Sequence, residues 1–103
     1  MIFVQLAVPV NGFDRVNILE FHAFDIFDTV KNYGIGFRYQ IYSVQNNSIS
    51  ALYDRYYSIT EAAAVSTILN ATYTGLTGSE CMTRAMLEYL IAKNLITGTI
   101  ERG

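Results

Sequence analysis

The sequence predicts an α+β fold, a mostly antiparallel sheet of about five strands with two to three helices packed on one face, in the order ββαββααβ. The chain has 103 residues, of which 51% are hydrophobic and only 16% charged, and this suits a single compact domain over residues 1–103. Two short Asn-containing turns separate runs rich in β-branched and aromatic residues. From Thr60 onward, apolar residues recur mainly at helical spacing.

The first two predicted strands form a hairpin. Residues 2–8 alternate between two largely apolar sides, which is typical of a strand buried on at least one face. Asn11 and Gly12 readily adopt the positive φ angles of a tight turn, so a second strand is expected after them. Residues 14–21 also fit a helix capped by Asp14, but their poor helix formers and the preceding turn favour a strand.

A short helix is expected over residues 26–33. Apolar residues recur at helical spacing from Ile26 to Tyr33, and Gly34 stands where a left-handed C-cap belongs. Asp25 is a suitable N-terminal cap for the same helix.

Residues 36–44 and 49–57 flank a loop at residues 46–48 and predict a second hairpin, which holds five of the eight tyrosines. Alternation across a three-residue loop divides these strands into a face expected to join the core and a face expected to bind. The first face would contain Phe37, Tyr39, Ile41, Tyr53, Arg55 and Tyr57, and the second Arg38, Gln40, Tyr42, Asp54 and Tyr56.

The last part of the chain predicts two helices and a final strand. The first helix runs from residue 61 to about residue 73, and the second covers residues 80–94 with Ser79 as its cap. Residues 95–100 are expected to form the last strand, weakened in its middle by Gly98.

Composition argues against several classes of function. The net charge is −2 and the basic residues are scattered, so the electrostatic attraction that nucleic-acid binding requires is not expected. No apolar run approaches ~20 residues and the N-terminus lacks a secretory pattern, so we expect no membrane span and a cytoplasmic location. With one cysteine and one histidine, the chain is expected to hold no disulfide, metal or cofactor.

The leading hypothesis is a small non-enzymatic protein-interaction module, an inhibitor or adaptor that acts as a homo-oligomer, most simply a homodimer. Sparse charge indicates that part of the surface is covered by another chain, and Tyr and Arg are enriched among residues that dominate interfaces. The small, uncharged back of the helix at 61–73 is a second candidate for a covered surface. The predicted interaction surface comprises Arg38, Gln40, Tyr42, Asp54, Tyr56, Ala63, Thr67 and Ala71.

Two alternatives remain open. In one, the protein binds a small, nucleotide-like molecule whose base stacks on tyrosine and whose anionic group meets Arg38 or Arg55. The residues of that site would be Tyr39, Tyr53, Arg55 and Tyr57. In the weaker alternative the protein is an enzyme that uses His22 with Asp25, or the Cys81 thiolate near a helix N-terminus, although no catalytic residue is assigned.

Overall fold

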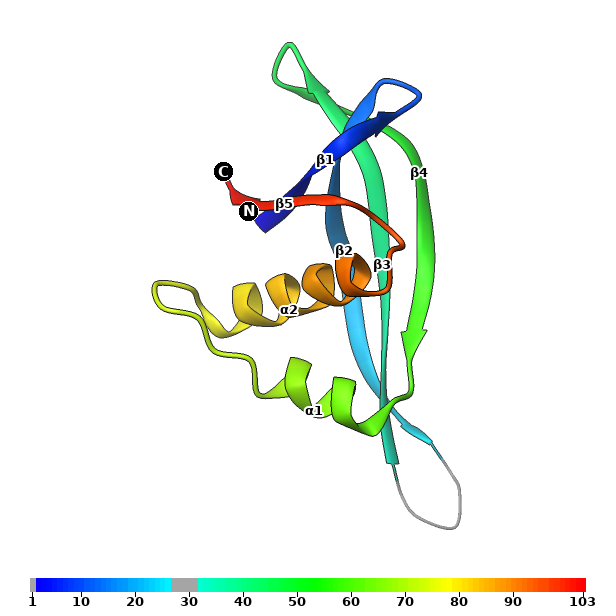
Figure 1. The fold of residues 1–103 in the computed structure, drawn as a ribbon, viewed down its shortest axis with the longest axis vertical. Coiled ribbons are helices and arrows are strands. Elements are labelled where there is room, and N and C mark those ends of the chain that lie inside the picture. The colour runs from blue at the N-terminus through cyan, green and yellow to red at the C-terminus, as the bar shows by residue number, and fades with distance from the viewer. Residues whose placement is uncertain (1, 27–31) are drawn as a thin grey trace.

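The computed structural model describes residues 2–26 and 32–103 and contains a five-stranded antiparallel sheet and two helices, which confirms the α+β class (Figure 1). The strand order across the sheet is β4-β3-β2-β1-β5. In chain order the elements are β1 (Ile2–Val10), β2 (Phe13–Ile26), β3 (Asn32–Gln45), β4 (Ser48–Ile59), α1 (Ala62–Leu69), α2 (Gly78–Ala92) and β5 (Gly98–Arg102).

The first hairpin forms as predicted, and residues 14–21 are strand. Its two-residue turn has positive φ at Asn11 (50°) and Gly12 (87°). The pairing of β1 with β2 is irregular between Gln5 and Val10. Pro9 lies within this irregular segment, where its missing N–H removes no regular ladder hydrogen bond.

The helix predicted over residues 26–33 is wrong at its first and last residues, which are strand. Residues 27–31, in its middle, lie outside the described part of the chain. Ile26 ends β2 and pairs with Asn32, the first residue of β3. Gly34 is not a helix cap, because it lies within β3 and pairs with Phe24. The cross-strand ladder supplies backbone partners here, so tertiary pairing overrides the local helical spacing.

The second hairpin confirms which residues share each predicted face, although its turn is shorter than expected. Asn46 and Asn47 alone form the turn, with φ of 52° and 63°. A register shift then leaves Leu52 outside the ladder, between the pairs Tyr42↔Ala51 and Ile41↔Tyr53. The extra residue restores the pairing that a three-residue loop would have given.

The helices differ from prediction mainly at their ends. α1 stops at Leu69, short of residue 73, and α2 begins after Thr77, where Ser79 was the expected cap. The Thr77 hydroxyl accepts a hydrogen bond from the Glu80 N–H (3.3 Å), and the Glu80 carboxylate accepts one from the Thr77 N–H (3.1 Å). The last strand, β5, begins at Gly98, so residues 95–97, which were predicted to belong to it, precede it.

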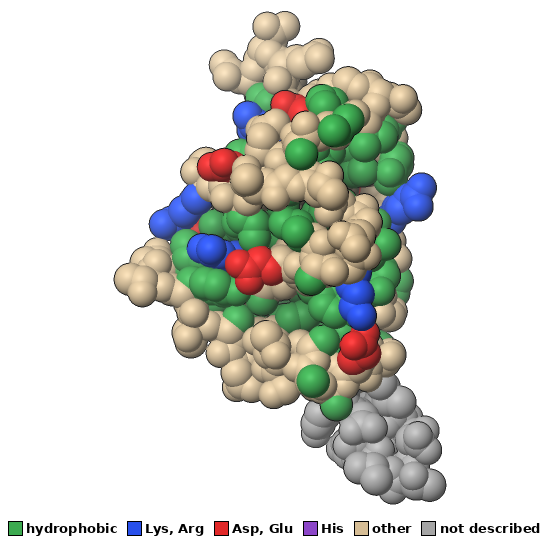
Figure 2. Space-filling view, in the orientation of Figure 1, with side chains coloured by type: hydrophobic (Ala, Val, Ile, Leu, Met, Phe, Trp, Pro, Cys, Tyr) green, Lys and Arg blue, Asp and Glu red, His purple; other side chains and the backbone are tan. Residues whose placement is uncertain are grey.

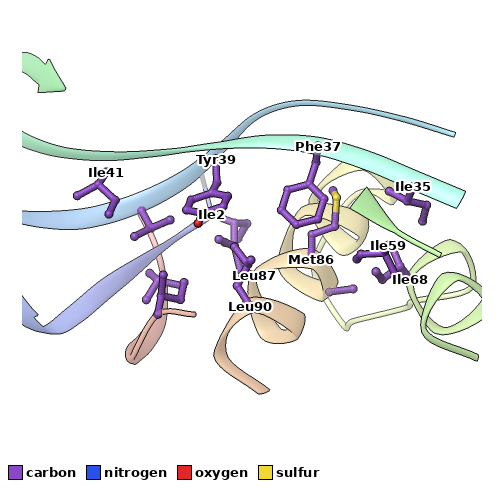
Figure 3. Close-up of a cluster of buried hydrophobic side chains, with 14 of the residues drawn as sticks. Ile2, Ile35, Phe37, Tyr39, Ile41, Ile59, Ile68, Met86, Leu87 and Leu90 are labelled. Atoms are coloured by element: carbon purple, nitrogen blue, oxygen red, sulfur yellow. The ribbon is translucent and has the colours of Figure 1, made fainter. Parts of the chain in front are cut away.

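The hydrophobic core lies between one face of the sheet and the two helices, which Figure 1 shows on the same side of it. In Figure 3, alternate side chains of β3 point toward Met86, Leu87 and Leu90 of α2. These β3 residues are Ile35, Phe37, Tyr39 and Ile41. In the described part of the chain, neither helix has the length and apolar character needed to cross a bilayer.

Candidate functional site

The face of the sheet turned away from the helices carries most of the predicted strand surface. Arg38 and Gln40 of β3 pair with Tyr56 and Asp54 of β4, and these positions alternate with the core residues of the same strands. β2 adds three side chains to this face, which we call the outer face. Its members are Glu20, His22, Phe24, Arg38, Gln40, Asp54 and Tyr56.

A charged group spans three strands of the outer face. The Arg38 Nε lies 3.2 Å from Glu20 Oε1 on β2, and its Nη1 lies 3.2 Å from Asp54 Oδ2 on β4. All three side chains are partly exposed, so these ion pairs contribute little to stability. They place the guanidinium between the Glu20 and Asp54 carboxylates.

An aromatic cluster of His22, Phe24 and Tyr56 lies beside this charged group, over two glycines of β3. The Tyr56 hydroxyl is hydrogen-bonded to His22 Nε2 (3.3 Å), and the His22 ring centroid lies 6.0 Å from that of Phe24. A β-carbon at Gly34 would overlap the Phe24 ring, and one at Gly36 would overlap Tyr56. The cluster therefore depends on glycine in β3. Tyr56 nevertheless remains 54% exposed.

The sequence interpretation missed the β2 part of the outer face. The signal was present as two glycines, Gly34 and Gly36, separated by one residue within a strand. Glycine inside a strand often marks a position that another group approaches closely. That group could not be identified locally, because Phe24 and His22 belong to β2 and Tyr56 belongs to β4.

Tyr42 corrects the predicted interaction surface, because it is 0% exposed. It pairs with Arg15 of β2, whose guanidinium lies 4.7 Å from the ring centroid of Phe3. Burial raises the pKa of the Tyr42 phenol, and the nearby positive charge of Arg15 only partly offsets the effect. This side chain is therefore an internal residue that no partner can reach without rearrangement.

Ala63 and Thr67 lie on α1, on the other side of the sheet from the outer face, whereas Ala71 follows the end of that helix. Ala63 and Thr67 are exposed and Ala71 is half-buried. Thr67 also lines a pocket of about 230 Å³ between the helices, together with Tyr73 and Tyr89. The predicted surface is thus two separate surfaces, and Figure 2 shows apolar side chains reaching the surface between charged ones on the side seen in Figure 1.

The residues of the predicted small-molecule site lie together on one face of the hairpin, where Tyr39 pairs with Arg55, but they differ in burial. Tyr39 is buried, and Tyr57 packs between Phe37 and Tyr89 with ring centroids 5.9 Å away in both cases. Tyr53 lines an open pocket of about 240 Å³. Arg55 lies over the Tyr53 ring, with Cζ 4.6 Å from its centroid. The remainder of the pocket is formed by Leu6, Val8, Val10, Ile41, Asn94, Leu95, Ile96 and Thr97.

Of the three residues considered for catalysis, His22 and Cys81 lie far apart in the chain and in different layers of the fold. Cys81 is buried in the first turn of α2, where its sulfur accepts a hydrogen bond from the Tyr73 N–H (3.3 Å). His22 contacts Tyr56 on the outer face, and the side chain of Asp25 lies outside what the structure describes. The described residues contain no group of three His, Cys, Asp or Glu side chains arranged to hold a metal.

No protein-family model, curated protein or solved structure matches this chain.

Proposed function

We propose that this protein is a non-enzymatic interaction module that binds another protein through its outer face and acts as an inhibitor or adaptor. The observation that carries this proposal is the aromatic cluster next to the Arg38 ion pairs, on the side of the sheet opposite α1 and α2. Tyr56 and Arg38 are adjacent cross-strand neighbours and supply apolar area, a hydroxyl and a guanidinium at one place.

Two physical features favour binding at this surface. Tyr and Arg are over-represented among residues that dominate interface energetics, because each combines a large contact area with directed hydrogen bonds. Both are already held in place, Tyr56 by His22 and Gly36 and Arg38 by two carboxylates. Ordering side chains costs free energy on association, so groups positioned beforehand reduce that cost.

The test is affinity purification of the tagged protein from its native host, with retained proteins quantified by mass spectrometry. We expect Tyr56→Ala and Arg38→Ala each to lose the same specific partner that the wild type retains. Thr67→Ala is the matched control on the opposite side of the molecule and should retain it. Equal recovery with all four proteins, or selective loss with Thr67→Ala, would contradict the proposal.

A second candidate function is the binding of a small, nucleotide-like molecule at the Tyr53 pocket. The observation that favours it is the Arg55 guanidinium over the ring of Tyr53, which lines that pocket. The salt bridges found among the described residues do not include Arg55. A thermal-shift screen of nucleotides tests this function. A rise in melting temperature that Arg55→Ala abolishes would support it, and no rise with any nucleotide would refute it.

A further inference from the structure

Part of β2 is an open edge of the sheet. The ladder between β1 and β2 ends at Val4↔Val16, whereas the ladder between β2 and β3 continues to Ile26↔Asn32. Among the described residues, none pairs with residues 20–26 of β2 on the β1 side. We call residues 20–26 the free edge. Such an edge presents backbone N–H and C=O groups that another strand can pair with.

The free edge has little of the protection that sheet edges usually carry. Residues 21–24 contain no charge, proline or lysine, and the charge of Glu20 is already paired with Arg38. His22 and Ala23 are exposed, and Phe21 and Phe24 are half-buried. β4 is the other long edge strand, but Leu52 interrupts its ladder and Asp54 and Arg55 lie near its middle. Irregular pairing and charge both oppose pairing between edges.

We propose that two copies of this chain associate by antiparallel pairing of their free edges, centred on Ala23. In an antiparallel pair, directly opposed residues point to the same face of the sheet. A two-fold axis between two residues would place outer-face residues of one copy opposite core-face residues of the other, so the axis must pass through a residue position. Beyond the pair Val4↔Val16, Ile2 and Phe3 of β1 continue alongside residues 17–18, and Leu19 lies at a register irregularity of β2, so the overlap is confined to residues 20–26. Ala23 is the midpoint of that stretch.

This register explains why the occupant is a second copy. It pairs His22 with Phe24 of the partner copy, which brings two aromatic residues of the outer faces together. Neither acidic residue of the stretch, Glu20 or Asp25, is paired with an acid. At the axis, Ala23 of one copy lies opposite Ala23 of the other. A charged residue at this position would face the same charge in the partner copy.

The consequence is one continuous sheet with both outer faces on the same side, since the two-fold axis is perpendicular to the sheet. This inference goes beyond the proposed function: the free edge shares Glu20, His22 and Phe24 with the outer face, but it pairs through their backbone groups. Substitutions at Ala23 leave Arg38 and Tyr56 in place, so failure of the dimer and failure of partner binding can be told apart.

The test is a charge-complementation experiment by sedimentation equilibrium over a wide micromolar concentration series. The wild type should approach twice the 11.6 kDa monomer mass. Ala23→Lys and Ala23→Glu should each be monomeric, because the axis brings two like charges together. An equimolar mixture of the two variants should restore the dimer. Ala63→Lys, on an exposed alanine of α1, is the matched control and should behave as the wild type.

Cysteine cross-linking provides a second measurement that does not depend on a charged variant folding. Ala23→Cys should form a disulfide-linked dimer on mild oxidation, while Ile49→Cys on the edge of β4 and Ala63→Cys should not. The native Cys81 is buried and should not compete. A wild type that is monomeric throughout, single charge variants that remain dimeric, a mixture that stays monomeric, or cross-linking through residue 49 in place of 23 would each overturn the proposal.

Discussion

Tyr56 lies across Gly36, and its phenol occupies the space in which a β-carbon at residue 36 would stand. The Cε1 atom of His22 approaches the same position to 2.9 Å from the opposite strand. Glycine in β3 therefore allows side chains of both neighbouring strands to meet above it, where Tyr56 and His22 form their hydrogen bond. The glycine at position 36 of β3 therefore determines how side chains of β2 and β4 meet on the outer face.

The first prediction concerns Gly36→Ala. The new methyl group should displace the Tyr56 ring and break its contact with His22, which the NMR chemical shifts of the His22 ring would report. Stability should change by only about 0.5 kcal/mol, because Tyr56 is exposed and can move outward.

Gly98→Ala is the matched comparison. A β-carbon there would meet the backbone carbonyl of Gln5, which cannot swing aside, so a cost of about 1–3 kcal/mol is expected in denaturant unfolding. A larger loss of stability for Gly36→Ala than for Gly98→Ala would contradict this account of the two positions.

Local patterns were enough to predict both hairpins but not the segment that joins them. Asn11 with Gly12, and Asn46 with Asn47, specify turns through their own φ preferences. Gly34 had the same local signature as a helix cap, and only its pairing with Phe24 reveals a strand. The Phe24 side chain that covers Gly34 belongs to another strand, so the residues next to Gly34 in the sequence could not predict this contact.

The faces of the second hairpin were predicted correctly even though the turn was not. The irregularity at Leu52 makes up for the shorter turn, so the residues from Ile41 and Tyr53 outward keep the expected register. Tyr42 also lies on the predicted side. Its burial could not be foreseen from alternation, because it depends on how β1 and β2 place Phe3 and Arg15 around it.

The second prediction follows from the Tyr42 hydroxyl, which is buried beside Arg15 and makes no hydrogen bond of good geometry with the described residues. Removal of a buried polar group that lacks a partner costs little, so Tyr42→Phe should change stability by less than about 1 kcal/mol. Tyr42→Ala removes the whole ring from the interior and should cost about 3–5 kcal/mol. Equal losses in the two variants, measured by urea unfolding, would show that the hydroxyl has an essential partner.

The same hydroxyl gives a third prediction, for alkaline pH. Burial raises the pKa of Tyr42 above its ordinary value of 10.0. The stability linked to this shift is therefore complete below pH 10 and is lost as the pH rises through the higher pKa of the folded state. Tyr42→Phe should lose less stability than the wild type above pH 10, measured by unfolding at matched ionic strength. Parallel losses in both proteins would contradict this.

The fourth prediction concerns the start of α2. The hydrogen bond from the Thr77 backbone N–H lowers the pKa of Glu80 below its ordinary value of 4.5, and the positive charge of Arg102 acts in the same direction. A lowered pKa stabilises the fold above pH 4.5, and this stability is lost as the pH falls through the lower value. Glu80→Gln should therefore be less stable than the wild type at neutral pH, and the difference should shrink in acid.

Thr77→Ala is the companion variant at this helix terminus. It removes the hydroxyl that accepts from the Glu80 N–H and should cost about 0.5–2 kcal/mol at neutral pH. If the difference between wild type and Glu80→Gln were the same at pH 7 and in acid, the carboxylate would not be the source of the effect.

The last prediction separates a structural from a reactive role for Cys81. A thiol at the start of a helix can become a good nucleophile, but only if reagents or substrate reach the sulfur. Cys81 is 4% exposed, and its sulfur instead accepts the Tyr73 N–H, which ties the segment after α1 to the first turn of α2. Labelling by a soluble disulfide reagent should therefore be slow in the native protein and should accelerate through the denaturant transition. Rapid, stoichiometric labelling without denaturant would instead indicate an accessible thiol and would revive the enzymatic alternative.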